Sequence, residues 1–308
     1  MTLSRKKSII VTGASSGIGS AASIKLVELG YQVFGLARSY DKLVSLFSSA
    51  SDRLPKINMK RDENLFVPIE CDITKPETFD NILNTIVSEA TGNNVFGLVN
   101  NAGYVEPGAI EDLDMNNLRS QFETNFFGLV EFTKKILPLM MQQKKDVATA
   151  EGRIVNISSI SGLISLPLIG AYSATKHALE AVSDALRMEL WNTGIKVITI
   201  NPGVIETNIY EPLRTKTQDL INRNKQSRFI GAYSRYFVNK KHTGLEPNAV
   251  ADVICNAISL PHPNQKYVIG STKEKMITKL LPLIPDKLFY SLISKQLKAD
   301  RKVHGREL

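Results

Sequence analysis

A tyrosine and a lysine lie four residues apart in the run Tyr172-Ser-Ala-Thr-Lys176. On a helix this spacing places both side chains on one face. A free phenol titrates near ~10, but a neighbouring ammonium can stabilise the phenolate and make the group a proton donor or acceptor near neutral pH. The pair alone is a weak signal. Ser159, in a Ser/Gly loop upstream, strengthens the prediction of an acid–base site.

A glycine-rich turn near the N-terminus could hold a nucleotide. The predicted strand Ser8–Thr12 runs into Gly13-Ala-Ser-Ser-Gly17-Ile-Gly19, which opens a helical pattern. Glycines let the backbone approach a pyrophosphate closely, and the helix N-terminus supplies N–H groups and a positive dipole end. The spacing is G-x-x-x-G-x-G and differs from the dinucleotide fingerprint G-x-G-x-x-G. A simple strand–helix turn is the alternative.

The end of the second predicted strand, Ala37-Arg38-Ser39, indicates which dinucleotide would bind. An NAD site usually has an acidic residue here for the ribose 2′-hydroxyl, whereas a cation favours the 2′-phosphate of NADP. Arg38 therefore predicts NADP(H), with added hydroxyl contacts from Ser15 or Ser39. The alternative is a solvated arginine at the end of a strand.

Short apolar segments alternate with longer helical patterns, which predicts a single α/β domain with a Rossmann-type, doubly wound parallel sheet. The expected strands are Ser8–Thr12, Gln32–Ala37, Leu65–Cys71, Gly97–Asn100, Arg153–Ile157, Lys196–Asn201 and Tyr267–Ile269. The clearest helical patterns are Gly19–Leu29, Pro76–Ala90, Leu118–Met141 and Ala171–Trp191. Two polar stretches are expected to be surface insertions, and a third follows the strand that would close the site: Ser48–Asn64, Gln142–Gly152 and Glu211–Gly244.

The composition fits a globular protein of one large domain or two small ones. The 308 residues are 43% hydrophobic and carry a formal net charge of +8. This charge suits anionic ligands, nucleic acid or an anionic membrane, and simple solubility explains it as well. Cys71 and Cys255 lack metal-ligand spacing and fit buried thiols of a reducing compartment. With no predicted signal peptide or membrane span, we expect a cytoplasmic protein without a metal site.

Several motifs of the chain, from about Lys6 to Val268, resemble those of the short-chain dehydrogenase/reductase family. The matching segments are Thr12–Gly19 for T-G-x-x-x-G-x-G, Asp72 for the acid that contacts adenine, Asn100–Gly103 for N-N-A-G, and Pro202–Thr207 for P-G-x-x-x-T. The positions that match the catalytic residues of the family are Asn125, Ser159, Tyr172 and Lys176.

The resemblance implies that NADPH delivers a hydride to a carbonyl carbon while Tyr172 gives a proton to the oxygen. Ser159 would hydrogen-bond that oxygen, and Asn125 would orient a water. Lys176 would lower the Tyr172 pKa and hold the nicotinamide ribose. The implied cofactor-binding residues are Gly13, Ser15, Ser16, Gly17, Ile18, Gly19, Arg38, Ser39, Asp72, Ile73, Asn101, Ala102, Gly103, Tyr172, Lys176, Pro202, Gly203, Val204 and Thr207.

Some of these positions also have plainer explanations. Asn125 could satisfy backbone groups inside a helix, Asn101 could be mainly structural, and Thr207 could be a helix N-cap. Ser158 precedes Ser159 and could be mistaken for it. The spacing of thirteen residues to Tyr172 favours Ser159.

Within the family, the chain looks most like members that act on hydrophobic ketones and alcohols, such as steroid, retinoid and acyl-dihydroxyacetone-phosphate reductases. We expect a catalytic domain over residues 1–270, with a substrate loop at about 207–245, and a helical extension with a charged tail over 271–308. In that extension, one face of the last helix is apolar: Leu288, Phe289, Leu292 and Ile293. A helix packed on its own domain or on a partner subunit is favoured over a lid or a peripheral membrane contact. The resemblance also implies a homodimer or homotetramer.

Two other classes of function compete with an active oxidoreductase. A noncatalytic NADP-binding regulator could use the same fold, but it would have no physical need for the complete catalytic set. A nucleic-acid binder is disfavoured because no basic motif interleaved with aromatic residues appears. We therefore expect hydride transfer between NADP(H) and the carbonyl or secondary alcohol of a small hydrophobic molecule, and no nucleic-acid partner.

Overall fold

A computed structural model describes residues 7–51, 65–90, 95–142, 152–205, 210–225, 227, 229–238, 244–280, 283–297, 302–303 and 306–307. Seven parallel strands form one sheet in the order β3-β2-β1-β4-β5-β6-β7. They are β1 (Ser8–Thr12), β2 (Gln32–Ala37), β3 (Phe66–Glu70), β4 (Val95–Asn100), β5 (Gly152–Ile157), β6 (Ile195–Pro202) and β7 (Lys266–Ile269). The predicted Rossmann-type sheet is confirmed.

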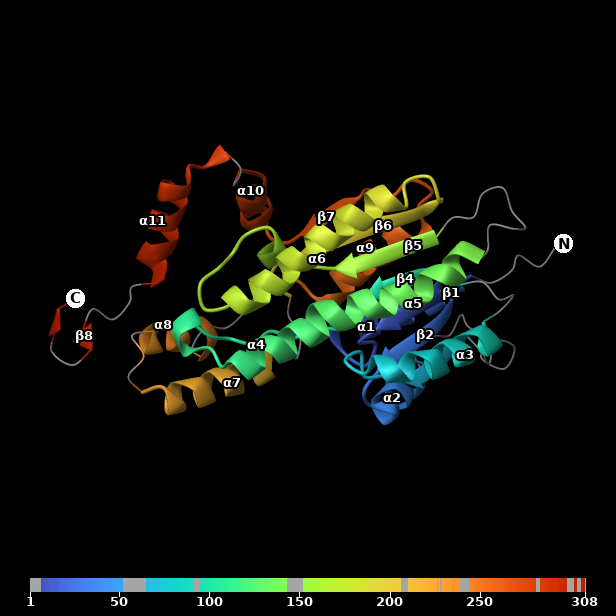
Figure 1. Cartoon of the computed structure of the whole chain (residues 1–308), viewed down its shortest axis with the longest axis horizontal. Helices are drawn as coiled ribbons and strands as arrows, with labels where there is room; N and C mark the ends of the chain where they lie inside the picture. The colour runs from blue at the N-terminus through green and yellow to red at the C-terminus, as the bar shows by residue number, and fades with distance from the viewer. Residues whose placement is uncertain are drawn as a thin grey trace.

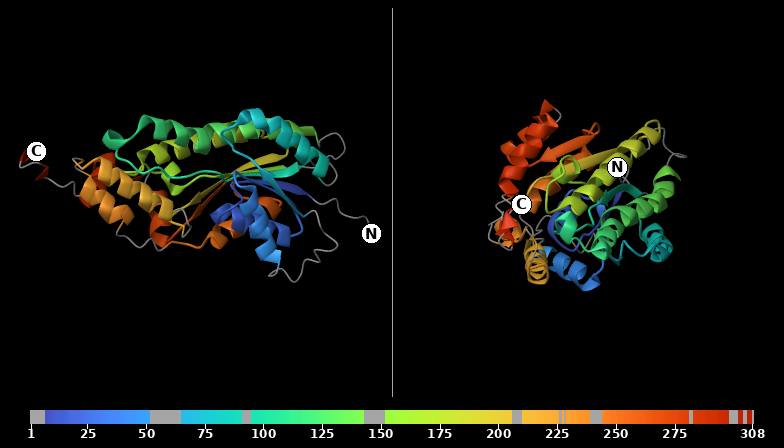
Figure 2. Two further views of the ribbon diagram at one scale, coloured as in Figure 1. Left: turned by 90° about the horizontal axis from the view of Figure 1, so that it is seen from below. Right: turned by 60° about the vertical axis from the view of Figure 1, so that its left-hand side comes forward.

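Helices cover both faces of the sheet (Figures 1 and 2). One face packs against α1 (Gly17–Glu28), α2 (Tyr40–Ser51) and α9 (Pro247–Ser259), and the other against α3 (Phe79–Glu89), α5 (Gly128–Gln142) and α6 (Gly170–Glu189). Successive side chains of a strand point to opposite faces, so Ile9 and Val11 join the first core and Ile10 joins the second. Both faces of the strands therefore carry apolar side chains.

The remaining elements lie mainly at the carboxyl end of the sheet. They are η1 (Pro76–Thr78), η3 (Ile110–Asp112), α4 (Met115–Phe122), η4 (Glu123–Phe127), η6 (Ile160–Gly162), α7 (Tyr210–Arg223), α8 (Ile230–Tyr233), η7 (Ser234–Val238), α10 (Thr272–Leu280), α11 (Asp286–Leu297), β8 (Lys302–Val303) and β9 (Arg306–Glu307). In the described part of the chain, no helix combines the length and apolarity needed to cross a membrane.

Three sequence predictions need correction. The substrate loop expected at about 207–245 is mostly helical where it is described, as α7, α8 and η7. The single helix expected over Leu118–Met141 is α4 and α5 joined through the π-helical turn η4. The insertion expected to end at Gly152 ends before it, because Gly152 begins β5 and is buried; residues 52–64 and 143–151 lie outside the described residues.

A buried chain of hydrogen bonds fixes the two central strands to the helices behind them. Asn100 Nδ2 donates to Thr133 Oγ1 of α5 (2.9 Å) and to Asn156 Oδ1 of β5 (2.8 Å). Asn156 Nδ2 in turn donates to Ser183 Oγ of α6 (2.7 Å). Buried polar groups are costly unless they are paired, so this network specifies how α5 and α6 lie on the sheet. The orientation of α6 matters because it carries Tyr172.

Both cysteines are free and buried. Burial raises the pKa of Cys71 and of Cys255 to about 12, so neither thiol is a thiolate near neutral pH. Among the described residues, no group of three His, Cys, Asp or Glu side chains could hold a metal ion.

Candidate active site

The carboxyl ends of four adjacent strands bring the predicted site residues to one end of the molecule (Figure 1). The glycine turn follows β1, Asn101 follows β4, Ser159 follows β5 and Gly203 follows β6. In open parallel sheets, ligands bind at this edge, where the strand order reverses. From β1 the sheet is extended by β2 and β3 on one side and by β4 to β7 on the other. The glycine turn after β1 therefore lies where the strand order reverses.

The glycine turn has the geometry of an anion site. Gly13 and Gly17 have positive φ angles of 65° and 56°, which favour glycine. A Cβ on Gly19 would lie 2.3 Å from the carbonyl oxygen of Gly13, so only glycine fits there. The side chain of Ser16, the N-cap of α1, makes no capping hydrogen bond, and no acidic residue lies in the first helical turn. The N–H groups of this terminus can therefore bind a phosphate.

Hydrogen bonds of Asn101 and Thr12 hold the glycine turn in place. Asn101 Nδ2 donates to the carbonyl oxygens of Thr12 (3.0 Å) and Gly13 (3.2 Å). Thr12 Oγ1 accepts from the backbone N–H groups of Asn101 (2.9 Å) and Ala102 (3.0 Å). The side chain of Asn101 thus has the structural role that the sequence left open.

At the end of β2, Arg38 is exposed and lies near Asp72. Burial acts to raise the pKa of the Asp72 carboxyl, but hydrogen bonds from Thr74 N (3.0 Å) and Oγ1 (2.8 Å) outweigh it. The positive charges of Arg38 and Lys75 add to this effect, so the pKa lies below its usual value. The cation and acid predicted to flank the adenosine end of the cofactor are therefore neighbours.

Ser159 and Tyr172 meet at the end of β5. Ser159 Oγ accepts from Ser161 N (3.0 Å) and lies 3.4 Å from the carbonyl oxygen of Pro202. Burial raises the pKa of Tyr172 to about 12, and a hydrogen bond with Ser159 acts to lower it. The phenol is therefore protonated at neutral pH in this structure.

Lys176 lies behind this pair, one helical turn along α6. Its Nζ donates to the carbonyl oxygen of Ile157 (2.8 Å) and lies 5.7 Å from the ring centroid of Tyr172. Burial lowers the Lys176 pKa to about 8, while Glu180 acts to raise it. In this structure burial has the largest effect on the Tyr172 pKa, and the lowering of that pKa by Lys176 stays a prediction.

Asn125 lies in the π-helical turn η4, fully buried. Its Nδ2 donates to the carbonyl oxygen of Tyr104 (2.8 Å) and to Thr175 Oγ1 (3.2 Å), and its Oδ1 accepts from Tyr104 N (2.9 Å). A Cβ on Gly103 would lie 3.1 Å from Asn125 Oδ1 and 3.7 Å from Lys176 Nζ. Asn125 therefore satisfies backbone groups and also lies beside the lysine; π-turns are frequent at functional sites.

The loop after β6 brings in a residue that the sequence analysis missed. Val204 N donates to Glu274 Oε1 of α10 (3.1 Å), and Gly203 N donates to the carbonyl oxygen of Ile269 (2.7 Å). The spacing Ser271-x-x-Glu274 before α10 is that of a capping box, which could have drawn attention to this carboxylate. Thr207 lies outside the described residues.

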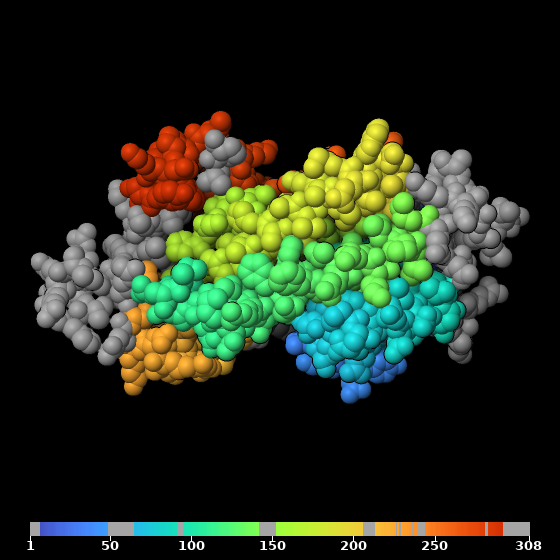
Figure 3. Space-filling model, in the orientation of Figure 1, coloured from blue at the N-terminus to red at the C-terminus, as the bar shows by residue number. Residues whose placement is uncertain are grey.

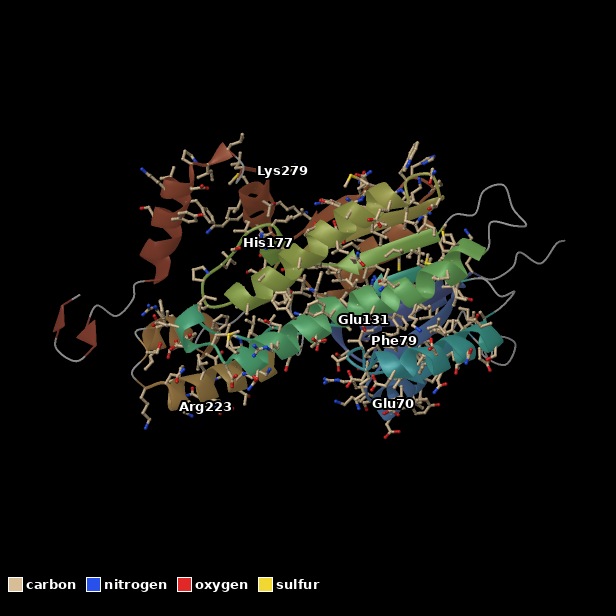
Figure 4. The ribbon with its side chains drawn as sticks, viewed as in Figure 1. Glu70, Phe79, Glu131, His177, Arg223 and Lys279 are labelled. Atoms are coloured by element: carbon tan, nitrogen blue, oxygen red, sulfur yellow. The ribbon has the colours of Figure 1, made fainter. Side chains whose placement is uncertain are left out.

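Two residues near the catalytic set make no contact with it. Ser158 is buried and its Oγ has no hydrogen-bond partner. His177 is exposed, and its Nδ1 lies 2.9 Å from the carbonyl oxygen of Ser173 (Figure 4). Ser15, Ile18 and Ser39 lie with the glycine turn and the end of β2, and Ile73 follows Asp72 after β3.

The sequence comparisons agree with this geometry. Residues 7–218 match the short chain dehydrogenase family, so the chain belongs to the short-chain dehydrogenases/reductases, which are oxidoreductases with a nicotinamide cofactor. The chain is 33% identical over 267 residues to the uncharacterized oxidoreductase YbbO of Escherichia coli, covering 86% of each protein. It is 31% identical over 289 residues to an NADPH-dependent 3-dehydrocapnine reductase of Ornithobacterium rhinotracheale, covering 94% and 96%. A 3-ketodihydrosphingosine reductase of Bacteroides thetaiotaomicron is 28% identical over 280 residues, with 91% and 94% covered.

Solved structures share the fold. A short-chain dehydrogenase from Streptomyces avermitilis has a TM-score of 0.70 and 29% identity, with 95% of this chain and 98% of that chain covered. An actinorhodin polyketide ketoreductase variant, solved with NADPH, has a TM-score of 0.67 and 26% identity over 86% and 95% of the two chains.

Proposed function

We propose that this protein is an NADP-dependent oxidoreductase that transfers a hydride between NADP(H) and a carbonyl or secondary alcohol of a hydrophobic molecule. The observation that carries the proposal is the convergence of four side chains. Ser159 hydrogen-bonds Tyr172, Lys176 lies one turn behind it, and Asn125 packs beside Lys176 under Gly103.

The roles of these residues follow from their contacts. The bound cofactor would supply the hydride. Tyr172, protonated at neutral pH, would give its proton to the substrate oxygen, and Ser159 would donate a hydrogen bond to that oxygen as negative charge develops. Lys176 would place a positive charge near the phenolate that Tyr172 leaves behind, which would make the proton transfer easier.

Arg38 supports NADP(H) over NAD(H). It is exposed at the end of β2, where a guanidinium can bind the 2′-phosphate. The NADPH-dependent relative and the NADPH-bound ketoreductase are in keeping with this choice. We expect Arg38→Ser to raise the KM for NADPH more than the KM for NADH. Equal changes would contradict the assignment.

The proposed hydrophobic substrate rests on two observations. One relative is named for 3-ketodihydrosphingosine, a keto lipid. An apolar cluster at the carboxyl end of the sheet joins Ala109, Leu168 and Tyr233, with partly buried side chains of α7 and η7 packed against it. This apolar character at the carboxyl end of the sheet favours a hydrophobic substrate over a small polar ketone.

The test is NADPH oxidation with ketones that range from small polar ones to steroids, retinal and acyl-dihydroxyacetone phosphate. Wild type should turn over a hydrophobic ketone, and Tyr172→Phe should lower kcat by about 10²–10⁴-fold. Tyr31→Phe is the matched control, because the Tyr31 hydroxyl lies 3.2 Å from Ser259 Oγ and the ring, which packs on the core before β2, is kept. NADPH binding without turnover of any ketone would favour the noncatalytic regulator.

The proposed assembly is a homodimer or homotetramer in the cytoplasm. Large apolar side chains are exposed on η4 and at the end of α6, namely Phe127, Met188 and Trp191. Trp191 is the single tryptophan and is 81% exposed. If this face forms the subunit interface, dilution should shift the Trp191 emission to the red as subunits separate. Sedimentation as a monomer at all concentrations would contradict the assembly.

A further inference from the structure

The C-terminal helices α10 and α11 have no buried side chain among the residues described from Ser271 to Ser291. Leu283 is 78% exposed, Tyr290 64%, and Met276 and Leu288 each 54%. The sequence favoured packing of this apolar face on its own domain or on a partner subunit. The described part packs on its own domain only partially, with Ile277, Ile284 and Phe289 half-buried. The exposed apolar side chains therefore need another partner or face water at a cost.

Positive charge is concentrated in the same segment. Residues 271–308 hold nine Lys or Arg and four Asp or Glu, so they carry a formal charge of +5 out of the total of +8. The lysines of the two helices whose side chains are described are all exposed: Lys273, Lys275, Lys279 and Lys287. The structure describes two acids in these helices. One of them, Glu274, accepts hydrogen bonds from Ser271 and Val204 and is therefore not a free carboxylate on the surface beside the lysines.

The two helices form a lobe at the carboxyl end of the sheet. Figure 3 shows their red surface at the upper left of the molecule, and Lys279 lies on α10 in Figure 4. The lobe is fastened at its base, where Glu274 accepts hydrogen bonds from Val204 N and from Ser271 N (2.7 Å). The lobe therefore stands beside the loop that follows β6.

We propose that the α10–α11 lobe docks on the surface of an anionic lipid membrane. An amphipathic segment with exposed Leu, Met and Tyr among lysines has the chemistry that anionic bilayers bind, because apolar side chains enter the interface while lysines meet the headgroups. A second copy of the lobe fits less well, since contact would bring two clusters of +5 together. The proposed membrane docking is independent of the proposed reaction. The further idea that docking brings the active site close to lipid substrates rests on the proposed function.

The test is cosedimentation of the full chain with vesicles of phosphatidylcholine alone or with about 30% phosphatidylserine. The chain should bind the anionic vesicles at least about tenfold more tightly than the neutral ones, and salt should weaken this binding. Lys279→Glu with Lys287→Glu should lower binding by about tenfold or more, and Leu283→Glu with Leu288→Glu should abolish it.

Matched controls distinguish vesicle binding by this surface from nonspecific hydrophobic binding and from effects on the reaction. Leu29→Glu removes a comparably exposed apolar side chain (57%) at the end of α1 and should bind like wild type. Tyr172→Phe should also bind like wild type, so failure of the proposed reaction leaves this test intact. Equal binding by wild type and the lobe variants, or no binding to anionic vesicles, would overturn the proposal. The proposal would also be overturned if the chain self-associates, and if the Leu283 and Leu288 changes abolish this self-association but leave vesicle binding intact.

Discussion

Ser158 and Ser159 are adjacent and both buried, but among the described residues only the hydroxyl of Ser159 has hydrogen-bond partners. Ser159 hydrogen-bonds Tyr172 and Ser161, whereas the hydroxyl of Ser158 has none. We expect Ser159→Ala to lower kcat by about 10²–10³-fold, because a donor to the developing oxyanion is lost. Ser158→Ala is the matched control and should stay within about twofold of wild type, since no hydrogen bond is lost. Steady-state kinetics would contradict this assignment if Ser158→Ala and Ser159→Ala lowered kcat equally.

Glu180, on the next turn of α6, acts on the pKa of Lys176. Its carboxylate acts to raise the Lys176 pKa, which burial lowers to about 8. Lys176 is charged below that value and loses its charge as pH rises through it. Turnover that depends on this charge should therefore fall above about pH 8. Glu180→Gln should move the alkaline fall in kcat to lower pH by about half a unit to one unit, because the opposing carboxylate is gone.

Asp184 provides the matched control for that measurement. It lies one turn further along α6 and pairs with Arg187 and Lys266. Asp184→Asn removes an acid from the same helix without touching Lys176, so the alkaline limb should stay in place. A pH profile that shifts equally in both variants would mean that general helix charge, and not Glu180, controls Lys176.

At the scale of elements, α7 is held to the loop after β4 by an ion pair. Lys216 of α7 contacts Glu106, which also accepts from Asn117 Nδ2 (3.1 Å). The Glu106 side chain is 10% exposed and that of Lys216 43%, so the two charges are unequally desolvated. Removing the exposed partner leaves a buried charge unpaired, whereas removing the buried one leaves a cation that water can solvate.

The two single variants should therefore differ in stability. We expect Lys216→Met to cost about 1–3 kcal/mol and Glu106→Gln less than about 1 kcal/mol, since Gln can still accept from Asn117. The free energy of unfolding in urea would measure both. A larger loss in Glu106→Gln would contradict this account of the pair.

The periodicity of the sequence predicted the strands, but it could not predict two of the helical features. The π-turn at Glu123–Phe127 shifts the helical phase by one residue, and tertiary contacts of Asn125 with Tyr104 stabilise it. α7 is polar overall, so it was expected to be a loop. Its few anchors, such as Leu213 and Thr217, are buried by packing that only the folded chain supplies.

At the scale of the whole molecule, the site residues come from strands far apart in the sequence. The motifs predicted which residue types gather after β1, β4, β5 and β6, because parallel strands share a carboxyl edge. They did not predict the contact between Val204 and Glu274, because nothing in the residue pattern tells which loop a helix end will touch. Nor did they predict the high pKa of Tyr172, which depends on its burial.

The boundary expected near residue 270 can be tested by truncation. None of the residues 271–280 and 283–291, whose burial the structure describes, is buried, and the last residue of the described core clusters is Ile269. A chain that ends at residue 270 should keep the far-ultraviolet circular dichroism of the sheet and helices and lose less than about 1–2 kcal/mol of stability. Cooperative unfolding lost on truncation would show that the extension supports the domain. The division into a catalytic domain and a C-terminal extension stays a prediction until then.

The position of β1 at the centre of the sheet has a consequence for synthesis of the chain. Ser8 pairs with Gln32 on one side and with Val95 on the other, and β1 and β4 are about 87 residues apart. A ribosome that adds about 5–20 residues per second reaches β4 roughly 4–17 seconds after β1. During that interval β1, which is fully buried in the folded protein, has one unpaired edge. The nascent chain, more than the finished protein, is therefore where chaperones would matter.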